Sequence, residues 1–250
     1  MPLRRAMMEK ELIIKGRWSI ETLDELMKSA TAIDDIGARI DFLSRRFLGT
    51  PYLDSTLIGD EKIDEIFVIN LSAMDCLTFL EYIEAMRLSS SFADFKESLK
   101  KLRYCGGAVS YETRNHFFSD WREFNDEHVE DVTKEIGLQK TKKIRKVMNL
   151  REEGSCFVSG IDPVQRDIEY VPSTVVDDLI IDRMKTGDYV GIYSDLKGLD
   201  VSHVGIFIRG ENSLSFRHAS STKENRKVID QDFAEYVRNK PGIIVLRPKR

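Results

Sequence analysis

The sequence lacks the patterns that hold a metal-bound or disulfide-bonded fold together. It contains three cysteines in 250 residues, an odd number at wide spacings, and no CxxC pair. This disfavours a zinc finger or a disulfide framework. At least one thiol therefore has no intramolecular partner, which suits a nucleophile and equally suits three inert core thiols.

Long apolar runs and a strong excess of one charge are also missing. No stretch approaches the ~20 apolar residues that cross a membrane. The net charge of −4 provides no basic surface for nucleic acid or anionic lipid. Residues 1–10 hold two arginines but not the apolar core of a signal peptide. We therefore expect a cytoplasmic protein, or a periplasmic one if a signal has been removed.

The apolar pattern predicts an α+β fold in a single domain, residues 1–250, without internal repeats or low-complexity linkers. Helical spacing predicts helices over residues 18–30, 33–48 and 92–103, with shorter ones over 174–184 and 231–239. Strands are predicted over residues 187–193, 202–208, 214–219 and 243–246. We expect a helical N-terminal region (about 18–105), an insertion (about 106–185) and a C-terminal β-sheet (about 186–248). Residues 126–150 are predicted to form a solvated helix and a linking strand.

The stretch around Cys76 has the pattern of a nucleophile site. A β-branched run at 66–69 predicts a short strand, and apolar residues recur at helical spacing after Cys76. Cys76 then lies in the first turn of a helix, where free N–H groups and the helix dipole lower the pKa of a thiol. A small core cysteine is the alternative interpretation.

Two of the four histidines are predicted to meet on one face of a β-hairpin. If the strands over 202–208 and 214–219 pair around the middle of residues 210–213, the numbers of opposed residues sum to 423. His203 and His218 are then diagonal neighbours, roughly 7–8 Å apart. The other face, directed into a core, carries Val204, Ile206 and Ile208. A slip of one residue would separate the histidines.

A cysteine with a histidine base can perform nucleophilic catalysis. One imidazole takes the thiol proton and later protonates the leaving amine, while a second polar group fixes the tautomer of the first. Cys76 and His203 are separated by 127 positions (203 − 76), similar to papain-type enzymes. A metal site of Cys76, His203 and His218 is the alternative, although zinc ligands usually include a closer pair.

A polar and aromatic segment, residues 111–121, is a candidate for substrate recognition. It includes Arg114, Asn115 and Trp121, and these residue types bind carboxylates and sugars well. A mixed loop and short helix packed by its aromatic residues is the alternative.

Four motifs follow one another in a recognisable order: Gly49-Thr50-Pro51-Tyr52, Met74-Asp75-Cys76-Leu77-Thr78-Phe79-Leu80-Glu81, Arg114-Asn115-His116-Phe117-Phe118-Ser119-Asp120-Trp121 and Gly198-Leu199-Asp200-Val201-Ser202-His203-Val204-Gly205. Together with His218-Ala219 they resemble the NlpC-type branch of the papain-like cysteine peptidases, which cut bacterial peptidoglycan peptides. Within that branch the chain is similar to the N-acetylmuramoyl-L-alanine amidase-like family.

The resemblance implies a papain-like fold in which a helical part with the nucleophile packs on an antiparallel sheet. It implies that Cys76 is the nucleophile, His203 the general base and His218 the residue that orients His203. It places Tyr52 near the cysteine, where it lines the site or stabilises the oxyanion. The implied partners are muropeptides, without a metal, an organic cofactor, a nucleic acid or an obligate protein partner.

One departure from typical NlpC endopeptidases bears on the substrate. Those enzymes have Ser-Gly after the cysteine and hold a free L-alanine amine with the flanking Asp and Ser, whereas Leu77 and Thr78 follow Cys76 here. This favours an amidase that cuts between the lactyl group of N-acetylmuramic acid and L-alanine through an acyl-enzyme on Cys76. The predicted substrate-binding residues are Tyr52, Asp75, Arg114, Asn115 and Trp121.

Three other functions stay open. One is a γ-D-glutamyl-diamino acid endopeptidase that acts on stem peptides with the same machinery. Another is a non-catalytic module that binds muropeptides. The last is an acyltransferase that uses the same thiolate.

Overall fold

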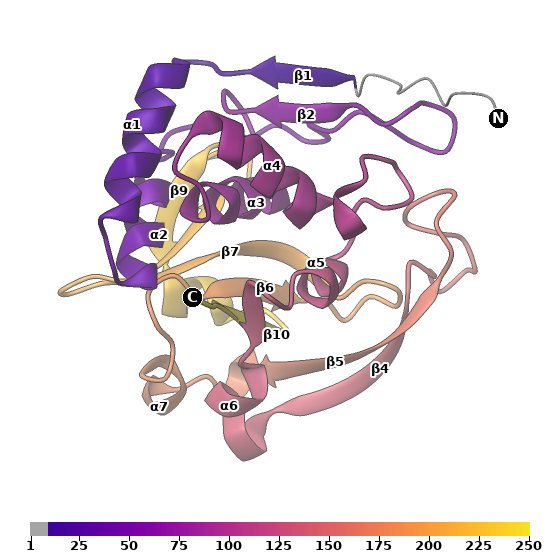
Figure 1. Cartoon of the computed structure of the whole chain (residues 1–250). Coiled ribbons are helices and arrows are strands. Elements are labelled where there is room, and N and C mark those ends of the chain that lie inside the picture. The colour runs from indigo at the N-terminus through magenta and orange to yellow at the C-terminus, as the bar shows by residue number, and fades with distance from the viewer. Residues whose placement is uncertain (1–9) are drawn as a thin grey trace.

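Four helices form one layer of the molecule (Figure 1). The computed structural model describes residues 10–250 and groups the helices α1 (Ile20–Thr31), α2 (Ile36–Arg45), α3 (Cys76–Arg87) and α4 (Phe92–Arg103). Each begins after a serine or aspartate whose side chain accepts a hydrogen bond from a backbone N–H of the first turn. Such caps pair donors that have no partner inside the helix. The predicted helices of the N-terminal region are therefore confirmed.

An antiparallel sheet of eight strands forms the second layer. The strand order is β4-β5-β10-β6-β7-β8-β9, and β3 pairs with β10 beside this path. The bounds are β3 (Val129–Asp131), β4 (Lys142–Met148), β5 (Val164–Pro172), β6 (Tyr189–Tyr193), β7 (Val201–Arg209), β8 (Leu214–Ala219), β9 (Val228–Asp232) and β10 (Gly242–Pro248). Every pairing in this sheet is antiparallel. The structure thus confirms an α+β fold with an antiparallel sheet.

A second, two-stranded sheet leads into helix α3, which begins at Cys76. Its strands, β1 (Glu11–Ile14) and β2 (Phe67–Asn70), run parallel, with Glu11 opposite Phe67. The predicted strand before Cys76 is therefore present as β2, but it lies outside the large sheet. Residues 1–9, on which the expectation about a signal peptide rests, lie outside the described residues.

Apolar side chains cover both faces of the large sheet. On one face, Val204 and Ile206 pack with residues of α1 to α4, as the hairpin pattern predicts. On the other face, Phe207 and Phe216 pack with residues of the shorter helices. The short elements are α5 (Phe118–Phe124), α6 (Thr133–Gly137), α7 (Asp178–Ile181) and α8 (Phe233–Val237), with single 3-10 turns η1 (Cys105–Gly107), η2 (Leu138–Lys140) and η3 (Ser173–Val175).

The insertion matches its prediction in part. Residues 126–150 contain one helix (α6) and a strand (β4), as predicted, but α6 is partly buried and a further strand, β3, precedes it. The strands β5 and β9 were not predicted. The edge strands β4 and β9 are largely exposed or half-buried. An edge strand that meets water on much of its surface carries little apolar alternation, which is the signal used to predict strands.

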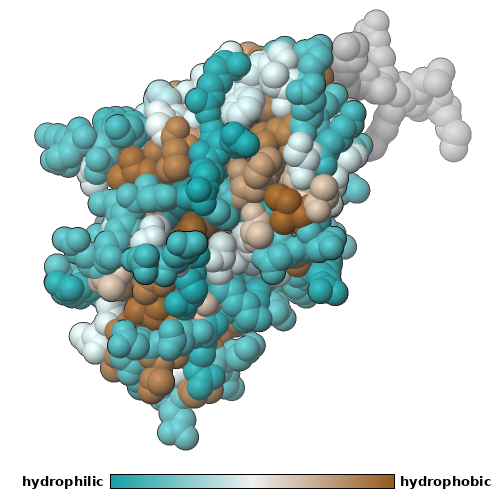
Figure 2. Space-filling view, turned by 90° about the vertical axis from the view of Figure 1, so that its left-hand side faces the viewer, coloured by the Kyte–Doolittle hydropathy of each residue, from teal (hydrophilic) through white to brown (hydrophobic). Residues whose placement is uncertain are grey.

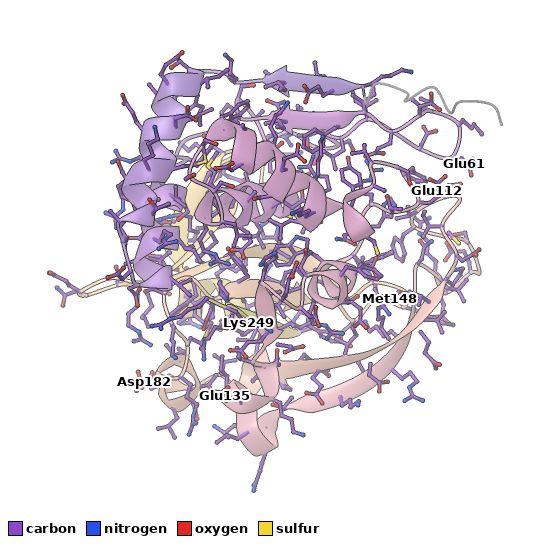
Figure 3. The ribbon with its side chains drawn as sticks, viewed as in Figure 1. Glu61, Glu112, Glu135, Met148, Asp182 and Lys249 are labelled. Carbon is purple, nitrogen blue, oxygen red and sulfur yellow. The ribbon has the colours of Figure 1, made fainter. Side chains whose placement is uncertain are left out.

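The outer surface is mainly hydrophilic on the face shown in Figure 2, where hydrophobic side chains form separate small patches. Glu135 of α6 and Asp182, just after α7, lie on the side of the sheet away from α1 to α4 (Figure 3). Among the described residues, no helix is long and apolar enough to cross a membrane.

Candidate active site

Cys76 is the first residue of α3, and Asp75 is its N-cap. The Asp75 carboxylate accepts hydrogen bonds from the backbone N–H of Thr78 at 2.8 Å and from the Thr78 hydroxyl at 2.9 Å. The Asp75 N–H donates in turn to the Thr78 hydroxyl at 3.0 Å. This reciprocal pair fixes the first turn of the helix. The structure therefore holds Cys76 at a helix start, where its sequence pattern places it.

Tyr52 lies beside the start of the same helix. Tyr52 and Met74 form a short bridge, in which the Leu53 N–H donates to the Met74 carbonyl at 3.2 Å. Burial raises the pKa of Tyr52, and its hydrogen bond to Asp54 and the nearby Cys76 raise this pKa further. Because the hydroxyl is engaged by Asp54, Tyr52 is better placed to line the site than to bind an oxyanion.

His203 of β7 and His218 of β8 are hydrogen-bonded, with 2.6 Å between Nε2 of His203 and Nδ1 of His218. The register of the hairpin produces this contact. Ile206 lies opposite Arg217, so the residue numbers sum to 423 and His203 is a diagonal neighbour of His218. The hairpin prediction is therefore confirmed.

Helix α3 and strand β7 meet at Val204. Helix α3 packs on β7, and the backbone N–H of Val204 interacts with the Cys76 thiol. Tyr236 of α8 completes this corner, with its ring centroid 6.3 Å from that of His203 and 5.0 Å from that of His218. In the described part of the chain no hydrogen bond joins Cys76 directly to His203. Catalytic contacts of this kind often tighten only when substrate binds.

Burial controls the protonation of these groups. It raises the pKa of the Cys76 thiol to about 12, and Asp75 adds to the rise, whereas backbone N–H groups, that of Val204 first, lower it. Burial lowers the pKa of His203 to about 3 and that of His218 to about 4. The site therefore rests as a neutral thiol and two neutral imidazoles. The lowered cysteine pKa expected at a helix start is corrected, because desolvation outweighs the helix dipole.

Nε2 of His203 and Nδ1 of His218 are engaged in the hydrogen bond between the two imidazoles. Within residues 10–250, no group of three His, Cys, Asp or Glu side chains is arranged to hold a metal ion. The geometry favours a cysteine with a histidine pair over a metal site made from the same three residues.

A hollow of about 430 Å³ opens beside the start of α3, and Asp75, Leu77, Arg114 and Asn115 contribute to its walls. The Arg114 guanidinium pairs with Glu65 at 3.2 Å. The Asn115 side chain donates to a backbone carbonyl at 2.9 Å, and its Oδ1 has no partner among the described residues. The structure thus brings Asp75, Arg114 and Asn115 to one hollow next to the cysteine.

Trp121 does not belong to this hollow. Its side chain is fully buried, and its ring lies 5.6 Å from that of Tyr189 and is stacked on Phe118. A buried indole has no surface to offer a ligand, so the predicted substrate contact of Trp121 is corrected: it is a core residue. An aromatic residue on a short helix gives the same sequence signal whether it faces a core or a cleft.

Gln231 and Tyr236 lie at the site but were not predicted there. The Gln231 Oε1 is 2.7 Å from Nε2 of His218. Gln231 lies on β9, whose mostly polar sequence hid the strand. Recognising β9 and pairing it with β8 would have placed Gln231 on the histidine face, because Gln231 lies opposite Phe216 and side chains alternate along a strand.

Solved structures share this fold. One is a protein from Legionella pneumophila, with a TM-score of 0.78 and 21% identity over 92% of this chain and 94% of that one. Another is an N-acetylmuramoyl-L-alanine amidase from Bacteroides uniformis, with a TM-score of 0.67 and 24% identity over 92% and 100% of the two chains. A third, from Bacteroides fragilis, is named as a candidate xylanase and has a TM-score of 0.64 and 25% identity over 82% and 98%. No curated protein matches the sequence.

The fold and the site define an α+β protein with a cysteine at a helix start and a hydrogen-bonded histidine pair on the adjoining sheet, residue types that serve in nucleophilic catalysis. Residues 42–243 match the model of the AmiA-like family, described as N-acetylmuramoyl-L-alanine amidase-like. The chain belongs to this family.

Proposed function

We propose that this protein is a cysteine amidase that hydrolyses the N-acetylmuramoyl-L-alanine bond of bacterial cell-wall muropeptides. The observation that carries the proposal is the His203–His218 hydrogen bond of 2.6 Å at the strand on which the Cys76 helix packs. The amidase-like family supplies the substrate class. We also propose that the fold is of the papain-like NlpC type, because the nucleophile helix precedes the histidine strands in the chain.

Acylation uses the thiol and one imidazole. The Cys76 sulfur attacks the lactyl carbonyl carbon while the free ring nitrogen of His203 takes the thiol proton. The tetrahedral intermediate then collapses, the C–N bond breaks, and the His203 imidazolium protonates the departing nitrogen of L-alanine. The products of this half-reaction are a peptide with a free N-terminus and a thioester on Cys76.

Deacylation repeats these steps with water. His203 takes a proton from a water molecule, whose oxygen attacks the thioester carbonyl. The C–S bond breaks, the lactyl carboxylic acid leaves, and the sulfur regains its proton from His203. The acyltransferase alternative differs only in this half-reaction, because an amine would replace the water.

Two kinds of donors are available for the oxyanion. The N–H groups at the start of α3 have no partner within the helix, and the one of Cys76 lies next to the sulfur. The Tyr236 hydroxyl has no hydrogen-bond partner among the described residues, and Cys76 adds to the burial-driven rise of its pKa to about 12. Tyr236 therefore stays a neutral donor near the thiol at physiological pH.

The hollow beside α3 is the proposed place for the substrate, with Asp75, Arg114 and Asn115 in its walls and Tyr52 near the same helix start. An Arg114→Ala variant should raise KM for a muropeptide with little change in kcat. Arg122→Ala, at a half-exposed arginine on α5, is the matched control. Unchanged kinetics in Arg114→Ala would remove Arg114 from the substrate-binding set.

The direct test is mass spectrometry of products after incubation with N-acetylmuramoyl-tripeptide, with Cys76→Ala as the control. The amidase releases the free sugar acid and an intact peptide that begins with L-alanine. A sugar that still carries a dipeptide, together with a diamino-acid fragment, would identify the endopeptidase instead. Release of reducing sugar from xylan, with the muropeptide left intact, would identify a glycosidase. No cleavage of either substrate favours a binding module.

A further inference from the structure

Gln231 is the last member of a chain of hydrogen bonds that runs across three strands of the large sheet. His203 on β7 contacts His218 on β8 at 2.6 Å, and His218 contacts Gln231 on β9 at 2.7 Å. The second contact joins Nε2 of His218 to the amide oxygen of Gln231. An amide oxygen accepts hydrogen bonds and cannot donate one, so Nε2 of His218 carries the hydrogen.

This single constraint determines the tautomers of both histidines. A neutral imidazole has one N–H, so Nδ1 of His218 has a lone pair when Nε2 carries the hydrogen. Nε2 of His203 must then be the donor of the 2.6 Å contact. Nδ1 of His203 is left with a free lone pair, and it has no hydrogen-bond partner among residues 10–250.

We infer that Gln231 is a positioning residue that makes Nδ1 of His203 the base, by holding His218 in the tautomer that accepts from His203. The inference rests on the proposed use of His203 as the base for Cys76. Without an acceptor at residue 231, His218 is free to carry its hydrogen on Nδ1. That hydrogen would face Nε2 of His203 and force the proton of His203 onto Nδ1, where it blocks proton uptake from the thiol.

The strand pairing holds Gln231 in place. Gln231 lies opposite Phe216, and Phe216 is on the same face of β8 as His218, so Gln231 is a diagonal neighbour of His218. On the other face the buried Arg217 binds Asp230 through two hydrogen bonds of 2.7 and 2.8 Å. Arg217 thereby locks β9 to β8 directly beside Gln231.

Charged groups around the two histidines shift their pKa values. Asp230 on β9 raises the pKa of His218, whereas Lys240, beyond α8, lowers the pKa of both histidines. Cys76 and Tyr236 are the other ionisable groups at this corner, and burial keeps both protonated. Both imidazoles are therefore neutral at rest, as the tautomer argument requires.

The ring-nitrogen NMR spectrum tests the inference without any substrate. The 15N shifts of His203 and His218 distinguish a protonated from a bare nitrogen, and four single His→Gln variants assign the four histidines of the chain. We expect both rings of the wild-type protein to carry the hydrogen on Nε2. In Gln231→Met, His218 should shift towards the Nδ1–H form. Gln165→Met, the same change at an exposed position of β5, should leave both rings unchanged.

Kinetics with N-acetylmuramoyl-tripeptide test the consequence. Gln231→Met should lower kcat by about 100-fold, the size of a general-base contribution, with KM within about twofold. Gln231→Glu keeps an acceptor and should recover much of kcat. Its negative charge should move the acidic limb of the pH profile upward by about one unit, because it favours the imidazolium.

The outcomes separate this inference from the proposed function. A hydrogen on Nδ1 of His203 in the wild type, or tautomers and pH profile that are unchanged in Gln231→Met, would overturn the role of Gln231 even if the muropeptide is cut. Absence of muropeptide cleavage would overturn the proposed function, while the tautomer pattern of the free protein would still decide the role of Gln231.

Discussion

The rings of His203 and His218 stand edge to face, with planes 89° apart and centroids 4.8 Å apart. The contact between them is the 2.6 Å hydrogen bond that joins Nε2 of His203 to Nδ1 of His218. In the mechanism that we propose, His218 orients His203 as a carboxylate would, but a neutral imidazole adds no negative charge to stabilise the imidazolium.

Removal of the nucleophile should abolish turnover and leave the fold intact. Cys76→Ala is expected to lower kcat by about 10⁴-fold or more, because covalent catalysis is lost. His203→Ala should be nearly as severe. The measurement is muropeptide turnover with circular dichroism of each variant. Cys105→Ala, at another free and half-buried cysteine, is the control and should keep wild-type activity; residual activity near wild type in Cys76→Ala would refute the thiol mechanism.

Tyr236 should contribute to catalysis through its hydroxyl. Tyr236→Phe keeps the ring contacts with His203 and His218 but loses the donor, so kcat should fall by about 10- to 100-fold with little change in KM. Tyr52→Phe, whose hydroxyl is engaged by Asp54, should have a smaller effect on kcat. Steady-state kinetics of the two variants show which tyrosine hydroxyl contributes to kcat. Equal effects, or none, would exclude Tyr236 as the oxyanion donor.

The partly buried His116 should make the protein less stable in acid. Burial lowers the pKa of His116 to about 4, below its unfolded value of about 6.5. The unfolded chain therefore binds more protons below pH 6.5, and the stability contributed by neutral His116 is present above that pH and lost as pH falls towards 4. The loss per histidine reaches at most about 1.4 kcal/mol per pH unit.

Buried carboxyl groups with raised pKa values, such as Glu81 and Asp200, change the stability with pH in the opposite direction. A comparison of the wild type with a variant that lacks His116 separates the two effects. The free energy of unfolding in urea should fall more steeply between pH 7 and pH 5 in the wild type than in His116→Gln. Parallel pH dependences would show that His116 titrates normally in the folded protein.

The buried ion pair behind the nucleophile should be costly to break. Glu84 and Arg87 of α3 are hydrogen-bonded at 2.7 Å, and the Tyr189 hydroxyl of β6 donates to Glu84 at 2.6 Å. Glu84→Ala leaves a buried guanidinium unpaired and should destabilise the protein by about 3–5 kcal/mol. The double variant Glu84→Ala, Arg87→Met should be less destabilised than the single one, because it removes that charge.

Urea unfolding of these variants measures the effect. The exposed Arg145–Asp167 pair at 2.7 Å supplies the control, since Arg145→Ala should change the free energy of unfolding by less than about 1 kcal/mol. A double variant no more stable than Glu84→Ala would mean that the cost comes from lost packing and not from the unpaired charge.

Local patterns predicted much of the site. The helix start at Cys76 follows from the β-branched run before it and the helical spacing after it. The His203–His218 contact follows from the alternation of side chains along two strands that pair around a turn. Both depend on residues no more than 15 positions apart in the chain, so the sequence carries them directly. The strands β5 and β9 were not predicted because edge or half-exposed strands leave a weak apolar signal.

The sequence by itself determined where the helices begin, the register of the hairpin and the residue types available for chemistry. Only the tertiary structure decided that Trp121 faces the core, that Gln231 reaches His218 and that burial raises the pKa of the Cys76 thiol. These three outcomes depend on burial and on contacts between separate elements of the fold. Burial arises when such distant segments pack together, and neither spacing nor composition encodes it at a single residue.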